Sequence, residues 1–178
     1  MKRCSWVTSE VLKQYHDEIW GIPTHDEKQL YKMLILEGLQ AGLSWEVILK
    51  KEHLYDKALD HYDYHKISQY DEDKYNELMN TDGLIKNKLK MKSIIQNAKA
   101  FIKVQEEYGS FDHYIWSYTD YKTIVHYYDT LVSFDDLSIT ISKDLKKKGF
   151  TFVGPTIIYS YLQAIGIYND HDIDCDFK

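Results

Sequence analysis

Two cysteines and two histidines lie near the ends of the chain in an arrangement that could bind a metal ion. Cys4 is followed by His16 after eleven intervening residues, and His171 precedes Cys175 with three residues between them. Two thiolates and two imidazoles form a tetrahedral ligand set for Zn²⁺ if the two ends of the chain meet. Four protein ligands leave no position for water, so such an ion would be structural. The spacing alone leaves a second interpretation open, namely two unrelated buried cysteines with histidines near them by chance.

The second candidate site residue is a single carboxylate on the apolar face of a predicted helix. Glu37 continues the i, i+3, i+4, i+7 spacing set by Leu30, Met33 and Leu34, with Ala41 at i+11. A charge that faces the core is energetically costly unless it is paired with protein groups or binds a ligand. From the residues alone, Glu37 is either a core acid satisfied by a backbone N–H or a tyrosine hydroxyl, or a site residue.

The segment MNTDGLIKNKLKMKSIIQNAKAF joins a tight turn at Gly83 to a lysine-rich helix. A turn whose backbone N–H groups are exposed before a helix start can hold a phosphate without reading sequence. An ordinary helix–helix turn with solvated lysines explains the same residues. The lysines of this region are Lys86, Lys88, Lys90, Lys92, Lys99 and Lys103, and a second cluster contains Lys143, Lys146, Lys147 and Lys148.

The elements that must position these groups are predicted to be helices, because two prolines and eight glycines leave few breaks. Expected helices cover residues 28–39 after Asp26, the stretch capped by Ser44, residues 71–79, residues 87–108 before Gly109, a segment within 137–150 stopped by Gly149, and a last helix between Pro155 and Gly166. The alternation in SITIS, residues 138–142, leaves a strand open there.

The composition is that of a single globular domain. The chain has 178 residues, of which 44% are hydrophobic and 28% charged. No run is long enough for a membrane span and the N-terminus lacks the apolar block of a signal peptide, so a cytoplasmic location is the default expectation. The net charge of −6 argues mildly against nucleic acid, although local basic patches can still contact phosphates.

Long strings of the chain resemble the bacterial DNA-3-methyladenine glycosylase I family, within the helix–hairpin–helix DNA glycosylase superfamily. The strings, in order, are RCSWV, YHDEIWGIP, LILEGLQAGLSWEVILKK, GLIKNKLKMKSIIQNAKAF and KKKGFTFVGPTIIYSYLQAIGIYNDH, with a cysteine four residues past that histidine. The resemblance runs nearly end to end. Two departures are a Cys4–His16 interval about one residue short of the family pattern and a hairpin with one glycine where the superfamily has two.

The resemblance implies an all-α, helix–hairpin–helix glycosylase domain over residues 1–178, with a smaller lobe formed by the two termini. It implies one structural Zn²⁺ ion held by Cys4, His16, His171 and Cys175. It also implies that Tyr15, Trp20 and Trp45 form the aromatic walls of a base pocket. Glu37 then matches the catalytic-site carboxylate that contacts the excised adenine.

The implied activity is monofunctional release of 3-methyladenine from alkylated double-stranded DNA, by a monomer that flips the base out of the duplex. An adenine methylated at N3 is cationic, so it leaves without a strong acid and stacks well on electron-rich rings. Leu43 is a candidate wedge in the base stack, and Gly83, Lys86 and Lys88 are candidate DNA-binding residues. Asp112 is a candidate for orienting water by chain position only, with helix capping as the competing role.

Two alternatives stay open on the sequence. The first is a hydrolase with a catalytic zinc, which requires one of the four ligands to be absent from the metal. The second is a zinc-stapled, non-enzymatic nucleic-acid-binding module. Release of free base from methylated DNA separates the glycosylase from the binding module, and a chelator separates a structural from a catalytic ion.

Overall fold

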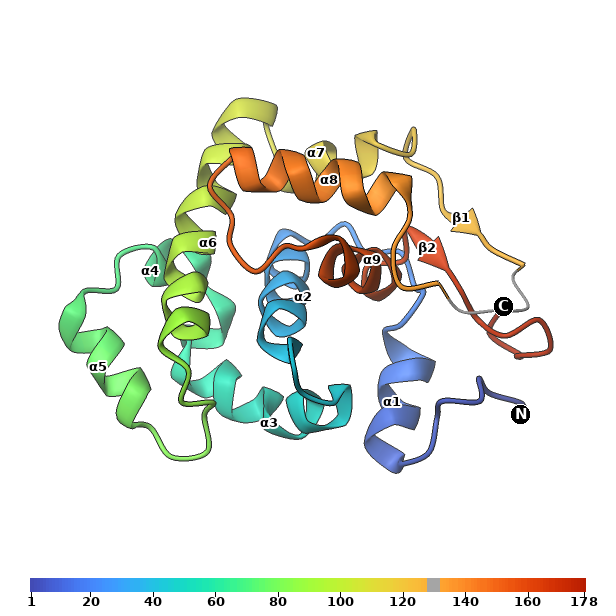
Figure 1. Cartoon of the computed structure of the whole chain (residues 1–178), viewed down its shortest axis with the longest axis horizontal. Helices are drawn as coiled ribbons and strands as arrows, with labels where there is room; N and C mark the ends of the chain where they lie inside the picture. Colours follow the sequence, from blue (N-terminus) through green and yellow to red (C-terminus); the bar gives the residue numbers. More distant parts are fainter. Residues whose placement is uncertain (128–131) are drawn as a thin grey trace.

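Helices make up nearly all of the regular structure in the computed structural model, which describes residues 1–127 and 132–178 (Figure 1). In chain order the elements are α1 (Glu10–Glu18), α2 (Glu27–Gln40), α3 (Trp45–Ala58), the 3₁₀ turn η1 (Asp60–Tyr62), α4 (Tyr64–Ile67), α5 (Glu72–Asn80), α6 (Lys88–Tyr108), α7 (Phe111–Ser117), β1 (Ile124–Val125), α8 (Asp136–Lys147), α9 (Pro155–Ala164) and β2 (Tyr168–Asn169). Within the described ranges, no helix is both long and apolar enough to cross a membrane.

The predicted starts of these helices are confirmed to within one residue. Asp26 and Ser44 act as caps as expected, whereas Asn87, predicted as the first helical residue, is the cap of α6. The Asp26 side chain accepts a hydrogen bond from the backbone N–H of Gln29 at the start of α2. Ser44 and Asn87 cap α3 and α6 in the same way, and α9 begins at Pro155. Each capping side chain satisfies one of the backbone donors that the first turn of a helix leaves unpaired.

The expectation of a wholly helical chain is wrong in one detail, a pair of very short parallel strands. In the pairing of β1 with β2, Ile124 aligns with Tyr168. Strands of two residues are too short to show a period of two, so the sequence carried no signal for them. The alternating segment SITIS is helical instead, within α8, and its Ser142 hydroxyl donates to the carbonyl oxygen of Val153 at 2.6 Å.

α2 lies at the centre of the core and packs against α3, α6, α7 and α9 (Figure 1). Nearly every residue from Leu30 to Leu39 is buried, so the helix is enclosed on all sides rather than along one stripe. Glu37 is the one charged side chain among those buried residues of α2. Its carboxyl group must therefore be neutral, or its charge must be satisfied by protein donors or by a ligand.

The two ends of the chain lie close together at one side of the molecule (Figure 1). The backbone N–H of Asp176 donates to the carbonyl oxygen of Lys2 at 3.0 Å, and the backbone N–H of Lys2 donates to the Asp176 carboxylate at 2.8 Å. This pairing sets the first cysteine of the chain beside the last one, as the expected metal set requires.

Candidate active site

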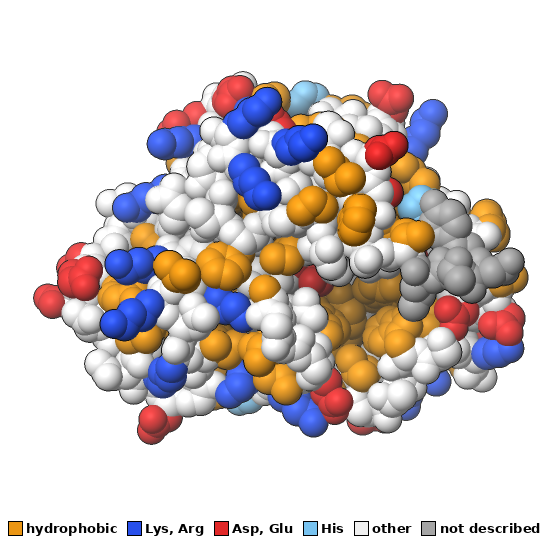
Figure 2. All heavy atoms as spheres, viewed as in Figure 1, with side chains coloured by type: hydrophobic (Ala, Val, Ile, Leu, Met, Phe, Trp, Pro, Cys, Tyr) orange, Lys and Arg blue, Asp and Glu red, His pale blue; other side chains and the backbone are white. Residues whose placement is uncertain are grey.

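A cavity of about 340 Å³ opens between α1, α2, α3 and α9, and Figure 2 shows a hollow there that is lined mainly by hydrophobic side chains. Its volume is within the range of small-molecule pockets. The lining residues are Trp6, Tyr15, Trp20, Glu37, Gln40, Trp45, Val132, Ser133, Thr156, Tyr159, Ser160 and Gln163. The structure thus brings together all four residues that the resemblance places in a base pocket.

The aromatic walls of the cavity consist of interlocking rings. Tyr15 and Trp45 meet edge to face, with centroids 5.2 Å apart. Trp6 meets Trp20 in the same manner at 5.0 Å. Edge-to-face pairs fix the ring planes beyond what burial alone achieves. Trp6 is a cavity residue that the sequence reasoning missed, although it lies two positions after the predicted metal ligand Cys4 in the string RCSWV.

The rings of Tyr15 and Trp20 are positioned by a short N-terminal helix, α1, which was not predicted from the sequence. α1 begins after Ser9, whose hydroxyl accepts from the backbone N–H of Leu12, and Tyr15 lies on its buried face. Trp20 follows the end of the helix, where its backbone N–H donates to the carbonyl oxygen of Tyr15 at 3.0 Å. The short helix α1 supplies Tyr15, and the turn that directly follows it supplies Trp20.

The Glu37 carboxylate lies in the cavity wall without a hydrogen-bond donor from the described residues, and the side chain is only 3% exposed. Burial raises the pKa of this carboxyl group to about 8. The pKa of the nearby Tyr15 phenol is also raised, first by burial and then by the Glu37 charge. A core acid satisfied by a backbone N–H or a tyrosine hydroxyl would show such a donor, so that interpretation gains no support.

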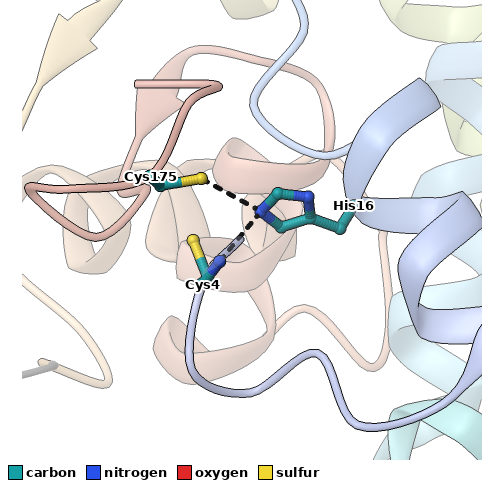
Figure 3. Close-up of side chains that lie close together, drawn as sticks. All are labelled: Cys4, His16 and Cys175. Atoms are coloured by element: carbon teal, nitrogen blue, oxygen red, sulfur yellow. Dashed lines mark hydrogen bonds between the residues drawn. The ribbon is translucent and has the colours of Figure 1, made fainter. Parts of the chain in front are cut away.

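Cys4, His16 and Cys175 form a buried group whose ligand atoms all lie within 4.8 Å of one another (Figure 3). The Sγ atom of Cys175 is 3.5 Å from Nε2 of His16. The other ring nitrogen of His16, Nδ1, lies 2.8 Å from the Asp17 carboxylate. A carboxylate on the second ring nitrogen is typical of metal-binding histidines, because it fixes the tautomer and the ring orientation.

His171 lies beside this group, with its ring centroid 4.9 Å from that of His16. Its Nδ1 atom is 3.0 Å from the Asn169 side-chain oxygen, whereas its Nε2 atom is buried without a hydrogen-bond partner. A Cβ atom at Gly21, whose φ is +75°, would lie 2.6 Å from this ring, so the ring needs a glycine there. His171 lies outside the group of ligand atoms within 4.8 Å of one another, but an unpaired buried nitrogen on a ring that contacts His16 suits a fourth ligand to Zn²⁺.

The predicted DNA-binding residues lie in two connecting segments and at the start of α6. Leu43 is half-buried and follows Gly42, with φ of +78°, in the loop between α2 and α3. Gly83 has φ of +83° in the turn between α5 and α6, and Lys86 and Lys88 are exposed beyond it. Lysine and arginine side chains also gather to the left of and above the hollow in Figure 2. Contact of these residues with DNA stays a prediction.

Lys90 corrects the expectation that the lysines of α6 form one solvated or DNA-facing row. Its side chain is buried, and its ammonium group donates to the carbonyl oxygen of Leu39 at 2.8 Å and to that of Ala41. The helical periodicity of this lysine-rich segment did not show that the Lys90 side chain points inward. The acceptors of Lys90 are backbone atoms at the end of another helix, α2, which the local sequence does not reveal.

Asp112 is not a cavity residue, so the idea that it orients water there is wrong. It lies in the first turn of α7, and its carboxylate is 2.7 Å from Nδ1 of His25. The polar wall of the cavity comes instead from Gln40 and from α9, through Tyr159 and Gln163 among others. Sequence reasoning placed α9 correctly but assigned it no part in the site.

The family model for methyladenine glycosylase matches residues 6–178. The chain is 38% identical over 179 residues to DNA-3-methyladenine glycosylase 1 of Escherichia coli K12, covering 98% of this chain and 96% of that one. The chain belongs to the methyladenine glycosylase family. A second family relative, DNA-3-methyladenine glycosylase of Haemophilus influenzae Rd, is 37% identical over 180 residues, covering 99% of this chain and 97% of its own.

Solved structures of the family have the same fold. A 3-methyladenine DNA glycosylase I in complex with 3-methyladenine superposes with a TM-score of 0.95 at 36% identity, covering 99% of this chain and 97% of that chain. The enzyme from Staphylococcus aureus gives a TM-score of 0.95 at 36% identity, covering 99% and 96%. Membership of this enzyme family disfavours the non-enzymatic binding module.

Proposed function

We propose that this protein is a monofunctional DNA glycosylase that removes 3-methyladenine from alkylated double-stranded DNA and acts as a monomer. The observation that carries the proposal is the buried Glu37 carboxylate, without a protein donor among the described residues, in the wall of an aromatic cavity. Its family relatives bear the name of this activity, and one solved neighbour holds 3-methyladenine.

The cavity suits a flat, positively charged base. In DNA, adenine methylated at N3 carries a positive charge, and the rings of Tyr15, Trp20 and Trp45 offer electron-rich faces to it. The Glu37 carboxylate accepts a hydrogen bond from the exocyclic amine and offsets the charge of the ring. The base therefore supplies the donor and the positive charge that this carboxylate lacks in the free protein.

Hydrolysis then needs little acid catalysis. A water molecule attacks C1′ of the deoxyribose, the bond from C1′ to N9 breaks, and N9 keeps the electron pair. The base leaves as neutral 3-methyladenine. The attacking water keeps one hydrogen in the new C1′ hydroxyl group and releases the other to solvent as a proton. The cavity holds the flipped nucleotide in place and excludes bulk water, while Glu37 binds and orients the cationic base until the bond from C1′ to N9 breaks.

The DNA-binding surface in this proposal is a helix–hairpin–helix element made of α5, the turn at Gly83 and the start of α6. Backbone N–H groups of the turn contact phosphates, and Lys86 and Lys88 add charge. Leu43, next to the flexible Gly42, enters the space that the flipped nucleotide vacates. Lys90 is excluded from this surface because it is buried.

The metal site in this proposal holds one structural Zn²⁺ ion on Cys4, His16, His171 and Cys175. When bound, the ion links the first and last segments of the chain and supplies no reacting group. Through the segment that follows Cys4, the site also holds Trp6 in the cavity wall. In the structure the backbone N–H of Asp172 donates to Sγ of Cys4 at 3.2 Å, and the rings of His16 and His171 are in contact.

The test is an incubation of the folded protein with methylated duplex DNA, with and without a chelator, followed by chromatography of the released bases. We expect free 3-methyladenine in both arms, because the ion takes no part in bond cleavage. Loss of release in a chelated protein that stays folded would support a catalytic ion. Tight binding of DNA without any released base would contradict the glycosylase activity and support the non-enzymatic nucleic-acid-binding module instead.

A further inference from the structure

Lys90 is a buried lysine whose role is not explained by DNA binding. It lies in the first turn of α6 and is 7% exposed. No acidic side chain of residues 1–127 or 132–178 forms an ion pair with it, and its partners are the carbonyl oxygens of Leu39 and Ala41. Burial lowers the pKa of its ammonium group. A lysine is desolvated in this manner only where its hydrogen bonds compensate.

The two acceptors are carbonyl groups at the end of α2, where a helix lacks intrahelical donors. α2 has no basic residue in its own last turn, so Lys90 supplies the positive charge from α6. A cation near the last carbonyl groups stabilises the helix end through hydrogen bonds and through the helix dipole. The contact spans 51 residues of sequence and therefore fixes how two helices sit against each other.

The end of α2 also carries the base cavity. Glu37 precedes Leu39 by two residues, and Gln40 of the same turn lines the cavity. The following loop is short: the Gln40 amide donates to the carbonyl oxygen of Leu43 at 2.9 Å, and Ser44 then caps α3. Trp45, the first residue of α3, is again a cavity residue. A contact that holds the end of α2 in place therefore also sets the separation between the Glu37 carboxylate and the Trp45 indole.

The start of α6 is, in turn, tied to the turn that precedes it. The Asn87 side chain accepts a hydrogen bond from the backbone N–H of Lys90 at 3.0 Å. Lys86 and Lys88 of the proposed DNA-binding turn flank this cap. Lys90 thus makes contacts in both directions, through its backbone to the turn and through its side chain to the cavity-bearing helix.

We propose that Lys90 is a positioning residue that couples the DNA-binding turn to the base cavity, by holding the end of α2 against the start of α6. The inference rests on the proposed glycosylase function. Lys90 touches neither the base nor a phosphate. It acts through the positions of Glu37 and Trp45, so its removal slows excision of a damaged base but leaves non-specific DNA binding intact.

The experiment compares Lys90→Met, which keeps the length of the side chain but removes its donors, with Lys88→Met at an exposed position nearby. Two quantities are measured for each: the single-turnover rate of 3-methyladenine release at saturating protein, and the affinity for undamaged duplex as a function of salt. For Lys90→Met we expect release to slow at least tenfold, with duplex affinity and salt slope unchanged within twofold. For Lys88→Met we expect a weaker, less salt-dependent affinity, as for a lost phosphate contact. Lys28→Met, at an exposed position at the far end of α2, is the control whose release rate and affinity both stay unchanged.

A purely stabilising role is distinguished by expressing the rate per folded molecule, with the folded fraction taken from circular dichroism. Lys90→Arg, which retains charged donors, should recover at least part of the lost rate. If Lys90→Met does not fold, Lys90→Gln removes the positive charge and shortens the donor, and its rate per folded molecule is compared in the same way. An unchanged rate per folded molecule, or a reduced salt slope for the Lys90 variants, would overturn the proposal. Absence of release from the unmodified protein would instead overturn the glycosylase function itself.

Discussion

The phenol ring of Tyr15 and the indole ring of Trp45 meet edge to face, with centroids 5.2 Å apart and planes inclined by 62°. The two rings come from α1 and α3, which pack against each other. The aromatic wall of the cavity therefore depends on a tertiary contact between two helices, and neither helix could form it alone.

Replacement of Trp45 tests this wall. Trp45→Leu removes the indole and should lower kcat/KM for 3-methyladenine release about tenfold, because the cation–π and stacking contribution of one ring is about 0.5–2 kcal/mol. Trp45→Phe keeps an aromatic face and should retain more of the activity. Equal losses in the two variants, measured at equal folded fractions, would show that the indole only fills space.

Glu37→Gln tests the carboxylate. The substitution keeps the size of the side chain but removes the carboxylate that binds and orients the cationic base, so we expect release to slow roughly 10- to 100-fold. Glu18→Gln, at an exposed position on α1, is the matched control and should retain full activity. A Glu37→Gln protein that excised 3-methyladenine at the unmodified rate would remove Glu37 from the catalytic assignment.

The raised pKa of Glu37 predicts a pH dependence of stability. The folded protein keeps a proton on Glu37 up to about pH 8, whereas the unfolded chain releases it near pH 4.3. Between these values the folded state binds more protons, so the free energy of unfolding decreases as the pH rises and levels off above pH 8. The full effect of one such group is on the order of 5 kcal/mol.

Other groups titrate in the same range, so the measurement is a difference. Denaturant unfolding of the unmodified protein and of Glu37→Gln, at several values between pH 5 and 9, isolates the contribution of this carboxyl group. We expect the variant to gain stability relative to the unmodified protein as the pH rises. A difference that is independent of pH would contradict a buried, protonated Glu37 in the free protein.

Much of the fold could be predicted because its signals are local. Asp26, Ser44 and Asn87 cap their helices through side chains that reach only three residues along the chain. The site was predicted only in part, because it depends on tertiary packing. Glu37 conflicted with its helix face and could be singled out, whereas Trp6 and Gln163 enter the cavity through contacts that sequence spacing does not encode.

The metal site predicts a measurable zinc content. Elemental analysis of purified protein should give one Zn²⁺ per chain. Cys175→Ser should lower both the zinc content and the melting temperature, because a structural ion contributes directly to folding. Asp174→Asn, at the exposed neighbouring position, should change neither the zinc content nor the release rate. A full complement of zinc in Cys175→Ser would remove that cysteine from the ligand set.

The net charge of −6 repels DNA on average, so binding must come from local cations. Lys86→Met and Lys88→Met should each reduce the slope of log affinity against log salt by about 0.9, the value for one lost phosphate contact. Lys28→Met is the matched control, because Lys28 is exposed at the opposite end of α2 from the loop that contains Leu43, about 20 Å away along the helix. Its slope should equal that of the unmodified protein. Equal slopes for all three variants, measured by fluorescence anisotropy on one undamaged duplex, would place the DNA on a face other than the turn at Gly83.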